Sequence, residues 1–152
     1  MPDHDRDRDL DVDRKVIIRG TDVLKVSTMA DPDWAHRQIG HLASASAIGL
    51  HVPALLGQGV MPDGRTWALW TRIVGPTMAE CTADGGELTI CQRTQLARIQ
   101  WACMSAGLYV GDLNRRNLIW TDNGWTVIDC GATRPKSVHE IRARLRAKWR
   151  LQ

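Results

Sequence analysis

Residues 110–131 constrain the fold of this chain more than any other segment of its sequence. Asp112 opens a short polar loop, and Asn117 closes it five residues later. Leu118–Trp120 and Trp125–Ile128 are short apolar runs, the length and character expected of buried strands. The segment therefore predicts a polar loop followed by two strands around a turn.

The turn itself, Asp122–Gly124, contains Asn-Gly, which readily adopts the positive φ values of a tight hairpin. Antiparallel pairing across it would bring Asn117 close to Asp129, which follows the second strand, with Asp112 on the same rim. Carboxylate and amide oxygens suit a hard cation such as Mg²⁺, and a carboxylate can accept the proton of a hydroxyl group. We therefore expect a metal and proton-transfer site at this rim.

The pattern resembles the catalytic loop (H-G-D-L-x-x-x-N) and metal-binding turn (I-D-F-G) of the protein-kinase-like superfamily, in its aminoglycoside-phosphotransferase and atypical-kinase branch. The resemblance implies that Asp112 is the catalytic base, that Asn117 and Asp129 bind Mg²⁺, and that ATP is the phosphate donor. Two positions depart from it, since Val110 replaces the His and Cys130 the usual Phe. The alternative is an acidic hairpin in an unrelated fold.

The runs 15–18 and 23–26 predict a β-hairpin near the start of the chain. Lys25 lies inside the second strand, and an unpaired charge there is costly when buried. In the same superfamily a V-L-K strand supplies the lysine that binds the α- and β-phosphates, and Val23-Leu-Lys25 matches it. The resemblance thus implies a catalytic, phosphate-binding Lys25, whereas the alternative is a lysine on the exposed face of an edge strand.

Asp31–Asp33 predicts a helix start, and Gly49 predicts its end. Related kinases place on this helix a Glu that pairs with the lysine, but no acidic residue occurs here between Asp33 and Asp63. Gln38 is the nearest residue by position, and it cannot form that ion pair.

Residues 50–56 and 66–74 predict two strands, with Gly57-Gln-Gly59 and Pro62-Asp-Gly64 between them as turn. The run 71–78 resembles the hinge that joins the two lobes of a kinase. By that resemblance, the backbone of Thr71, Arg72 and Ile73 would bind adenine.

Residues 87–108 predict a helix whose apolar stripe includes Ile90, Leu96, Ile99, Trp101 and Met104. Residues 138–149 predict a second helix with Val138, Ile141, Leu145 and Trp149 on one face. Seven Lys and Arg against one Glu in residues 134–152 favour a solvated basic back. An acidic protein partner is an alternative use of that helix, and nucleic acid is the least favoured.

Two expected features of a kinase are missing. The only glycine before Gly40 is Gly20, so no Gly-x-Gly-x-x-Gly loop precedes Lys25. About twenty residues follow Gly131, too few for an activation segment and the helices of a peptide-docking floor. Short kinase-like effectors that bacteria inject into host cells have a similarly reduced C-lobe and often depend on a host partner.

The sequence therefore predicts an α+β chain with a minimal protein-kinase-like fold: a small antiparallel-sheet N-lobe and a truncated, mostly helical C-lobe. Its expected parts are a disordered charged head (1–14), the N-lobe (15–74) and the C-lobe (75–152). We expect an ATP- and Mg²⁺-dependent serine/threonine protein kinase that needs an activating protein partner. The alternatives are a pseudokinase-like binding module and a small-molecule phosphotransferase.

Composition bears on membrane spans, cellular location and the state of the cysteines. Hydrophobic residues make up 43% and charged residues 24%, no apolar run approaches 18 residues, and the first residues are charged. We expect no membrane span and a cytoplasmic location, with secretion into a host by a route without a signal peptide as the alternative. The four scattered cysteines predict buried free thiols rather than a zinc site.

Overall fold

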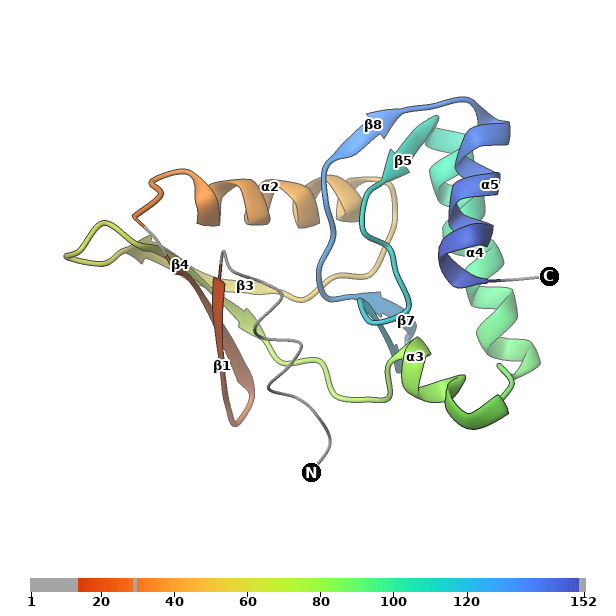
Figure 1. Cartoon of the computed structure of the whole chain (residues 1–152), viewed down its shortest axis with the longest axis horizontal. Coiled ribbons are helices and arrows are strands. Elements are labelled where there is room, and N and C mark those ends of the chain that lie inside the picture. Colours follow the sequence, from red (N-terminus) through yellow and green to blue (C-terminus); the bar gives the residue numbers. More distant parts are fainter. Residues whose placement is uncertain (1–13, 29, 151–152) are drawn as a thin grey trace. The chain divides into compact units, whose positions relative to one another are not determined.

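The structure of the chain is a computed structural model that describes residues 14–28 and 30–150 (Figure 1). The described residues form a mixed α/β fold with small antiparallel sheets and four α-helices. They divide into a first unit, up to Ile39 plus Ala54–Arg72, and a second unit, Gly40–Pro53 plus Ile73 onward. The assignment of these parts to kinase lobes stays a prediction. The predicted disordered head lies outside the described residues except for Arg14, the first residue of β1.

The first unit contains a four-stranded antiparallel sheet in the order β1-β2-β4-β3. Its strands are β1 (Arg14–Arg19), β2 (Asp22–Ser27), β3 (Leu55–Val60) and β4 (Thr66–Thr71). The predicted hairpin at the start of the chain is confirmed, since β1 and β2 pair along their whole length. Gly20 turns the chain between them with φ of 54°.

The predicted turn at Gly57 and Gly59 is wrong, because both glycines lie inside β3. The indole of Trp67 on β4 covers them, and a Cβ at Gly59 would lie 2.7 Å from that ring. The glycines therefore make room for a tryptophan on the neighbouring strand rather than a change of direction. The turn is at Met61–Gly64, where the Met61 N–H donates to the Arg65 carbonyl at 2.7 Å.

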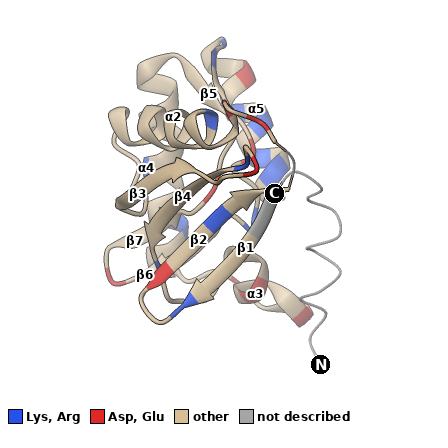
Figure 2. Cartoon of the chain, turned by 90° about the vertical axis from the view of Figure 1, so that its left-hand side faces the viewer, with Lys and Arg blue, Asp and Glu red and all other residues tan. Residues whose placement is uncertain are grey.

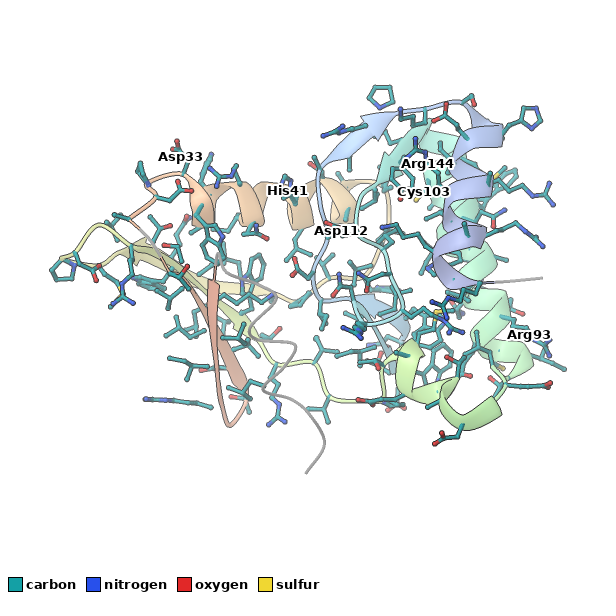
Figure 3. The ribbon with its side chains drawn as sticks, in the orientation of Figure 1. Asp33, His41, Arg93, Cys103, Asp112 and Arg144 are labelled. Atoms are coloured by element: carbon teal, nitrogen blue, oxygen red, sulfur yellow. The ribbon has the colours of Figure 1, made fainter. Side chains whose placement is uncertain are left out.

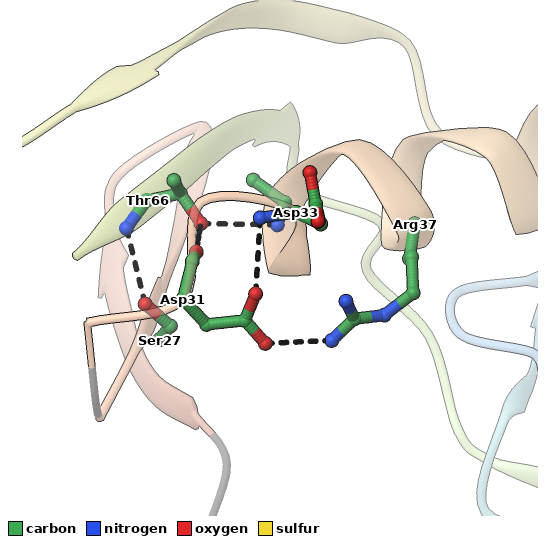
Figure 4. A network of polar contacts seen from close by, with 6 residues as sticks. Ser27, Asp31, Asp33, Arg37 and Thr66 are labelled. Atoms are coloured by element: carbon green, nitrogen blue, oxygen red, sulfur yellow. Dashed lines mark hydrogen bonds and ion pairs between the residues drawn. The ribbon is translucent and has the colours of Figure 1, made fainter. Parts of the chain in front are cut away.

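Helix α2 (Trp34–Ala47) begins close to the predicted acidic start. The Asp31 carboxylate accepts from the Asp33 N–H at 3.0 Å and from the Arg37 guanidinium at 2.7 Å (Figure 4). The Arg37 hydrogen bond, followed by the Asp33 N–H, holds the pKa of Asp31 below its ordinary value. The Thr66 hydroxyl on β4 donates to the Asp31 carbonyl at 3.0 Å, and its N–H donates to Ser27 Oγ at 3.0 Å. This network joins the helix start to the sheet.

The second unit combines helices with two small two-stranded sheets. Its elements are α3 (Met78–Cys81), the 3₁₀ turn Ala83–Gly85, α4 (Ile90–Ala106), β5 (Leu108–Val110), β6 (Leu118–Thr121), β7 (Gly124–Val127), β8 (Thr133–Pro135) and α5 (Val138–Trp149). Strand β5 pairs with β8, and β6 pairs with β7. Among the helices of the described ranges, none has the length and apolarity needed to span a bilayer.

The predicted apolar stripe of α4 is confirmed at Leu96 and Ile99, which are 1% and 7% exposed. It is wrong at Ile90 and Trp101, which are 77% and 70% exposed. The buried face also carries Gln92 and Cys103. Gln92 is buried because it has two polar roles. Its side chain forms a capping box with Thr89, and its carbonyl accepts a hydrogen bond from the Trp125 indole at 2.9 Å.

The predicted face of α5 is confirmed at three of its four positions. Ile141, Leu145 and Trp149 have no exposed surface, whereas Val138, in the first turn, is 46% exposed. Ser137 begins the helix by accepting the Glu140 N–H. The buried face therefore starts one turn after the helix does.

Candidate functional site

The two candidate metal ligands flank the β6–β7 hairpin: Asn117 directly precedes β6, and Asp129 follows β7. Leu118 pairs with Val127 and Trp120 with Trp125, as the sequence predicted. The expectation that both Asn123 and Gly124 take positive φ is wrong in part. Only Gly124 does, with φ of 95°. Gly124 is the first residue of β7, so it follows the turn, and the turn is not of type I′, which needs positive φ at both central residues.

The hairpin places Asn117 and Asp129 next to each other along the backbone. The N–H of Ile128 donates to the Asn117 carbonyl at 3.0 Å, one step beyond the last strand pair. Both side chains are half-buried. The structure thus supports the predicted adjacency of these two residues through a hydrogen bond between their own segments.

Asp112 has a left-handed backbone conformation, with φ of 55°. This conformation is uncommon for a residue with a side chain, and the cost is of order 1–2 kcal/mol. The side-chain amide of Asn117 donates to the Asp112 carbonyl at 2.8 Å and closes the loop. The Asp112 carboxylate is 68% exposed. A strained backbone that presents an exposed carboxylate is a feature of functional loops.

A pair of backbone hydrogen bonds joins this loop to the Asp129–Gly131 turn. The Gly131 N–H donates to the Gly111 carbonyl at 2.8 Å, and the Gly111 N–H donates to the Ala132 carbonyl at 3.1 Å. The two segments run so close that a Cβ on Gly131 would lie 3.0 Å from Asp112 Oδ2. A side chain at position 131 would therefore crowd the Asp112 carboxylate, which would have to shift to make room.

Buried side chains fix the loop from below. Leu113 has no exposed surface, and its carbonyl accepts the indole N–H of Trp149 on α5 at 2.8 Å. Val110 and Cys130, the two positions that depart from the kinase pattern, are 0% and 3% exposed. Both residues belong to the core below the rim, so the departures change packing and leave the polar groups of the rim in place.

A cleft of about 250 Å³ opens beside Asp112. Its lining comes from the Asp112 loop, the Gly131 turn, the β5–β8 pair and α5: Tyr109, Gly111, Asp112, Gly131, Ala132, Arg134, Lys136 and Arg144. Lys148, one turn beyond Arg144 on α5, lies with its Nζ 3.8 Å from Asp112 Oδ1. Figure 3 shows Asp112 on its loop and Arg144 on α5. The candidate base thus borders a cleft rich in cations.

The residues of the rim fit a magnesium ion. Asn117 uses its amide N–H₂ to hold Asp112, which leaves its amide oxygen as a ligand. That oxygen and the Asp129 carboxylate are both hard oxygen donors, the type that Mg²⁺ prefers. Within residues 14–28 and 30–150, no group of three or more His, Cys, Asp or Glu side chains is placed to hold a metal. Mg²⁺ needs no such group, because it binds one or two protein carboxylates together with substrate phosphates and water.

The predicted nucleotide residues Lys25, Thr71 and Arg72 belong to the first unit, and Ile73 belongs to the second. Lys25 is half-buried, and it is the only cation of β2. Figure 2 shows the Lys and Arg positions of the described residues in blue. The N–H groups of Thr71 and Arg72 donate to the carbonyls of Ala54 and Thr21. Adenine binding by this segment therefore has to use other backbone groups, and all four assignments stay predictions.

Sequence reasoning missed Arg144, Lys148 and Trp149 as neighbours of the Asp112 loop. The signal was present, because α5 is amphipathic and Trp149 lies on its buried face. The period of a helix identifies that face, but not the segment against which it packs.

No protein-family model matches this chain, and no curated protein sequence is significantly similar to it. Solved structures of WbdD are similar in fold. A high-resolution crystal structure of WbdD has a TM-score of 0.60 at 18% identity, over 83% of this chain and 31% of that one. A structure titled as the bifunctional kinase-methyltransferase WbdD has a TM-score of 0.63 at 15% identity, over 91% and 34%.

A third structure, of WbdD with the kinase inhibitor LY294002, has a TM-score of 0.55 at 17% identity, over 82% of this chain and 32% of that one. At these identities the likeness shows the fold alone. The chain spans about a third of the WbdD chains that it matches. A small mixed α/β chain with a likeness to a kinase-containing protein is compatible with a kinase-like domain.

Proposed function

We propose that this chain is an ATP- and Mg²⁺-dependent phosphotransferase whose general base is Asp112. The observation that carries the proposal is the clamp between two short segments. Backbone hydrogen bonds hold the Asp112 loop against the Asp129 turn, and the Asn117 amide ties the loop to its own first residue. This arrangement supports the proposal of a base at Asp112 and of two metal ligands at Asn117 and Asp129.

Each residue has a role in this proposal. The exposed Asp112 carboxylate accepts the proton of an acceptor hydroxyl. Asn117 and Asp129 would hold Mg²⁺, which when bound neutralises charge on the phosphates. Lys25 is proposed to contact the phosphates as well, on the strength of its sequence motif. The serine or threonine hydroxyl of a protein, with an activating partner, is one acceptor of this chemistry, and a small molecule is another.

The test measures phosphate transfer from radiolabelled ATP together with stabilisation by Mg-ATP. Asp112→Asn is the variant of choice, because Asn tolerates the left-handed backbone and lacks the basic carboxylate. We expect transfer to fall about 10²- to 10⁴-fold while Mg-ATP still raises the melting temperature. Asp129→Asn should lose the stabilisation by Mg-ATP.

Asp122→Asn is the matched control. Asp122 is an exposed acid in the turn of the same hairpin, away from the rim. It should transfer phosphate and respond to Mg-ATP like the unmodified chain. Equal transfer by all four proteins would rule out the proposed base and ligands.

A second candidate function is a binding module without catalysis. The observation that favours it is the exposed face of α4, where Ile90 and Trp101 are 77% and 70% exposed. Large apolar side chains on a surface are a feature of interaction sites. Absence of any Mg-ATP stabilisation in the unmodified chain, together with absence of transfer, would favour this module over the enzyme.

A further inference from the structure

We infer that the cleft beside Asp112 binds an anionic group of the phosphate acceptor, and that the acceptor is a small hydroxyl compound bearing a phosphate ester. The inference rests on the proposed function, because it assigns a substrate class to that site. It starts from the charge of the cleft lining. Three of its eight residues, Arg134, Lys136 and Arg144, are cations, and only Asp112 is acidic.

The neighbouring acids do not neutralise these cations. Glu140 is shared, with its carboxylate 3.6 Å from Lys136 Nζ and 3.5 Å from Arg144 Nε. The single negative charge of Glu140 offsets only one of these two positive charges. Both ion pairs are exposed, so solvent screens them. No acidic side chain of the described residues pairs with Arg134. Lys148 and Asp112 balance each other. The cleft therefore keeps an excess of positive charge.

The buried ring of Tyr109 lies beside two of these cations, Arg144 and Arg134. Its side chain is 8% exposed and lines the cleft. The Arg144 guanidinium lies over the ring, 5.3 Å from its centroid, and this cation–π contact orients the guanidinium. Tyr109 pairs with Arg134 across the β5–β8 ladder, so their side chains share one face of that sheet. The ring thus orients one guanidinium group, and Arg134, on the same face of the sheet, lines the same cleft.

Arginine suits phosphate, because its planar donors bind phosphate oxygens in pairs. A volume of about 250 Å³ is below the 300–1,000 Å³ common for sites of whole drug-sized ligands. It accommodates a phosphate and part of a sugar or polyol. An acceptor anchored in this way presents its free hydroxyl at the Asp112 wall of the same cleft. Size and charge together therefore favour a small phosphate ester over a protein segment.

The first experiment measures binding without nucleotide, so it does not depend on catalysis. Inorganic phosphate is titrated at constant ionic strength, and binding is followed by ³¹P NMR line broadening. We expect saturable binding that weakens about tenfold or more in Arg144→Gln. Arg142→Gln is the matched control, because Arg142 is exposed on the same helix and outside the cleft, and its affinity should not change. No binding, or equal affinity in Arg144→Gln, would overturn the inference.

The second experiment measures ADP release with matched acceptors: glycerol against glycerol 3-phosphate, glucose against glucose 6-phosphate, and a serine peptide rich in Asp and Glu. We expect kcat/KM to be at least tenfold higher for a phosphate ester than for its neutral partner. The ratio should fall towards one in Arg134→Gln/Arg144→Gln and persist in Arg142→Gln. Preference for the acidic peptide, or for neutral acceptors, would overturn the assignment.

The two experiments separate this inference from the proposed function. Absence of ADP release with every acceptor, beside phosphate binding that Arg144→Gln abolishes, contradicts the phosphotransferase and supports the anion site. ADP release that depends on Asp112 but shows no preference for phosphate esters supports the phosphotransferase and contradicts the proposed substrate class.

Discussion

Two hairpins of this chain carry candidate functional residues, and they differ in how they are buried. In β1–β2, which contains Lys25, only Val26 and Ser27 of β2 are buried, and the other four residues of that strand are half-buried. In β6–β7, every residue of β7 is buried, and Trp120 packs edge-on against Trp125 with ring centroids 5.1 Å apart.

The difference shows two ways to position a polar side chain. Lys25 lies in the middle of a strand, and its place follows from the pairing of β2 with β1 and β4. Asn117 and Asp129 lie just outside their strands, so their place depends on a buried hairpin and on hydrogen bonds beyond it. The second arrangement is the more sensitive to changes in the core beneath it.

The largest expected effect on stability is at Trp125, whose side chain is 2% exposed and donates to the Gln92 carbonyl. Trp125→Ala should lower the free energy of unfolding by about 3–5 kcal/mol, because it leaves a cavity and removes a buried hydrogen bond. Leu24→Ala, at a half-buried position of β2, should cost about 1–2 kcal/mol. Urea unfolding followed by circular dichroism measures both, and equal costs would contradict the comparison.

The next largest effect on stability concerns two glycines: Gly75, which packs against the β6–β7 hairpin, and Gly20, in the turn of β1–β2. A Cβ on Gly75 would overlap the carbonyl oxygen of Trp120 in β6, whereas a Cβ on Gly20 meets nothing within 4 Å. Gly75→Ala should cost about 3 kcal/mol or more, because backbone has to move. Gly20→Ala should cost about 1–2 kcal/mol, the penalty for its positive φ alone. Melting temperatures of the two variants test this order, and a larger loss for Gly20→Ala would reverse it.

Cys103 reports the burial of the second unit's core through pH. Burial raises the pKa of its thiol from 9.0 to about 11, against backbone hydrogen bonds that lower it. A raised pKa favours the neutral thiol in the folded chain. The associated stability is therefore complete below pH 9 and is lost as the pH rises towards 11, by at most roughly 2–3 kcal/mol.

Unfolding measured from pH 8 to 11 checks this prediction. Cys103→Ala should reduce the loss of stability over that range. Cys91→Ala is the control, since Cys91 is exposed on the same helix, and it should leave the loss unchanged. An identical pH slope in Cys103→Ala and the unmodified chain would contradict the assignment.

The smallest effect is expected at the rim itself. Lys148 and Asp112 are 34% and 68% exposed, and a pair of this kind contributes less than about 1 kcal/mol. Lys148→Ala should therefore change the melting temperature little at any salt concentration. A loss of 2 kcal/mol or more would mean that the rim, and not only the core below it, holds the loop in place.

The sequence predicted much of the local structure for physical reasons that are local. The β1–β2 and β6–β7 hairpins, the start of α2 and the buried face of α5 follow from alternation, turn residues, an acidic start and helical period. The buried face of α4 could be predicted only in part in this way. Its buried face includes Gln92, which a hydrophobic pattern does not select and which is held by Thr89 and Trp125.

What the sequence by itself determined is the order of the polar residues: Asp112, Asn117 and Asp129 at spacings that a short hairpin brings to one rim. Only the tertiary structure decided what surrounds them. The Trp149 indole bonds to Leu113, the Gly111–Gly131 pair joins loop and turn, and α5 brings Arg144 and Lys148 to the cleft. These contacts join segments distant in sequence. No local pattern encodes them, because the packing of buried faces sets which segments meet.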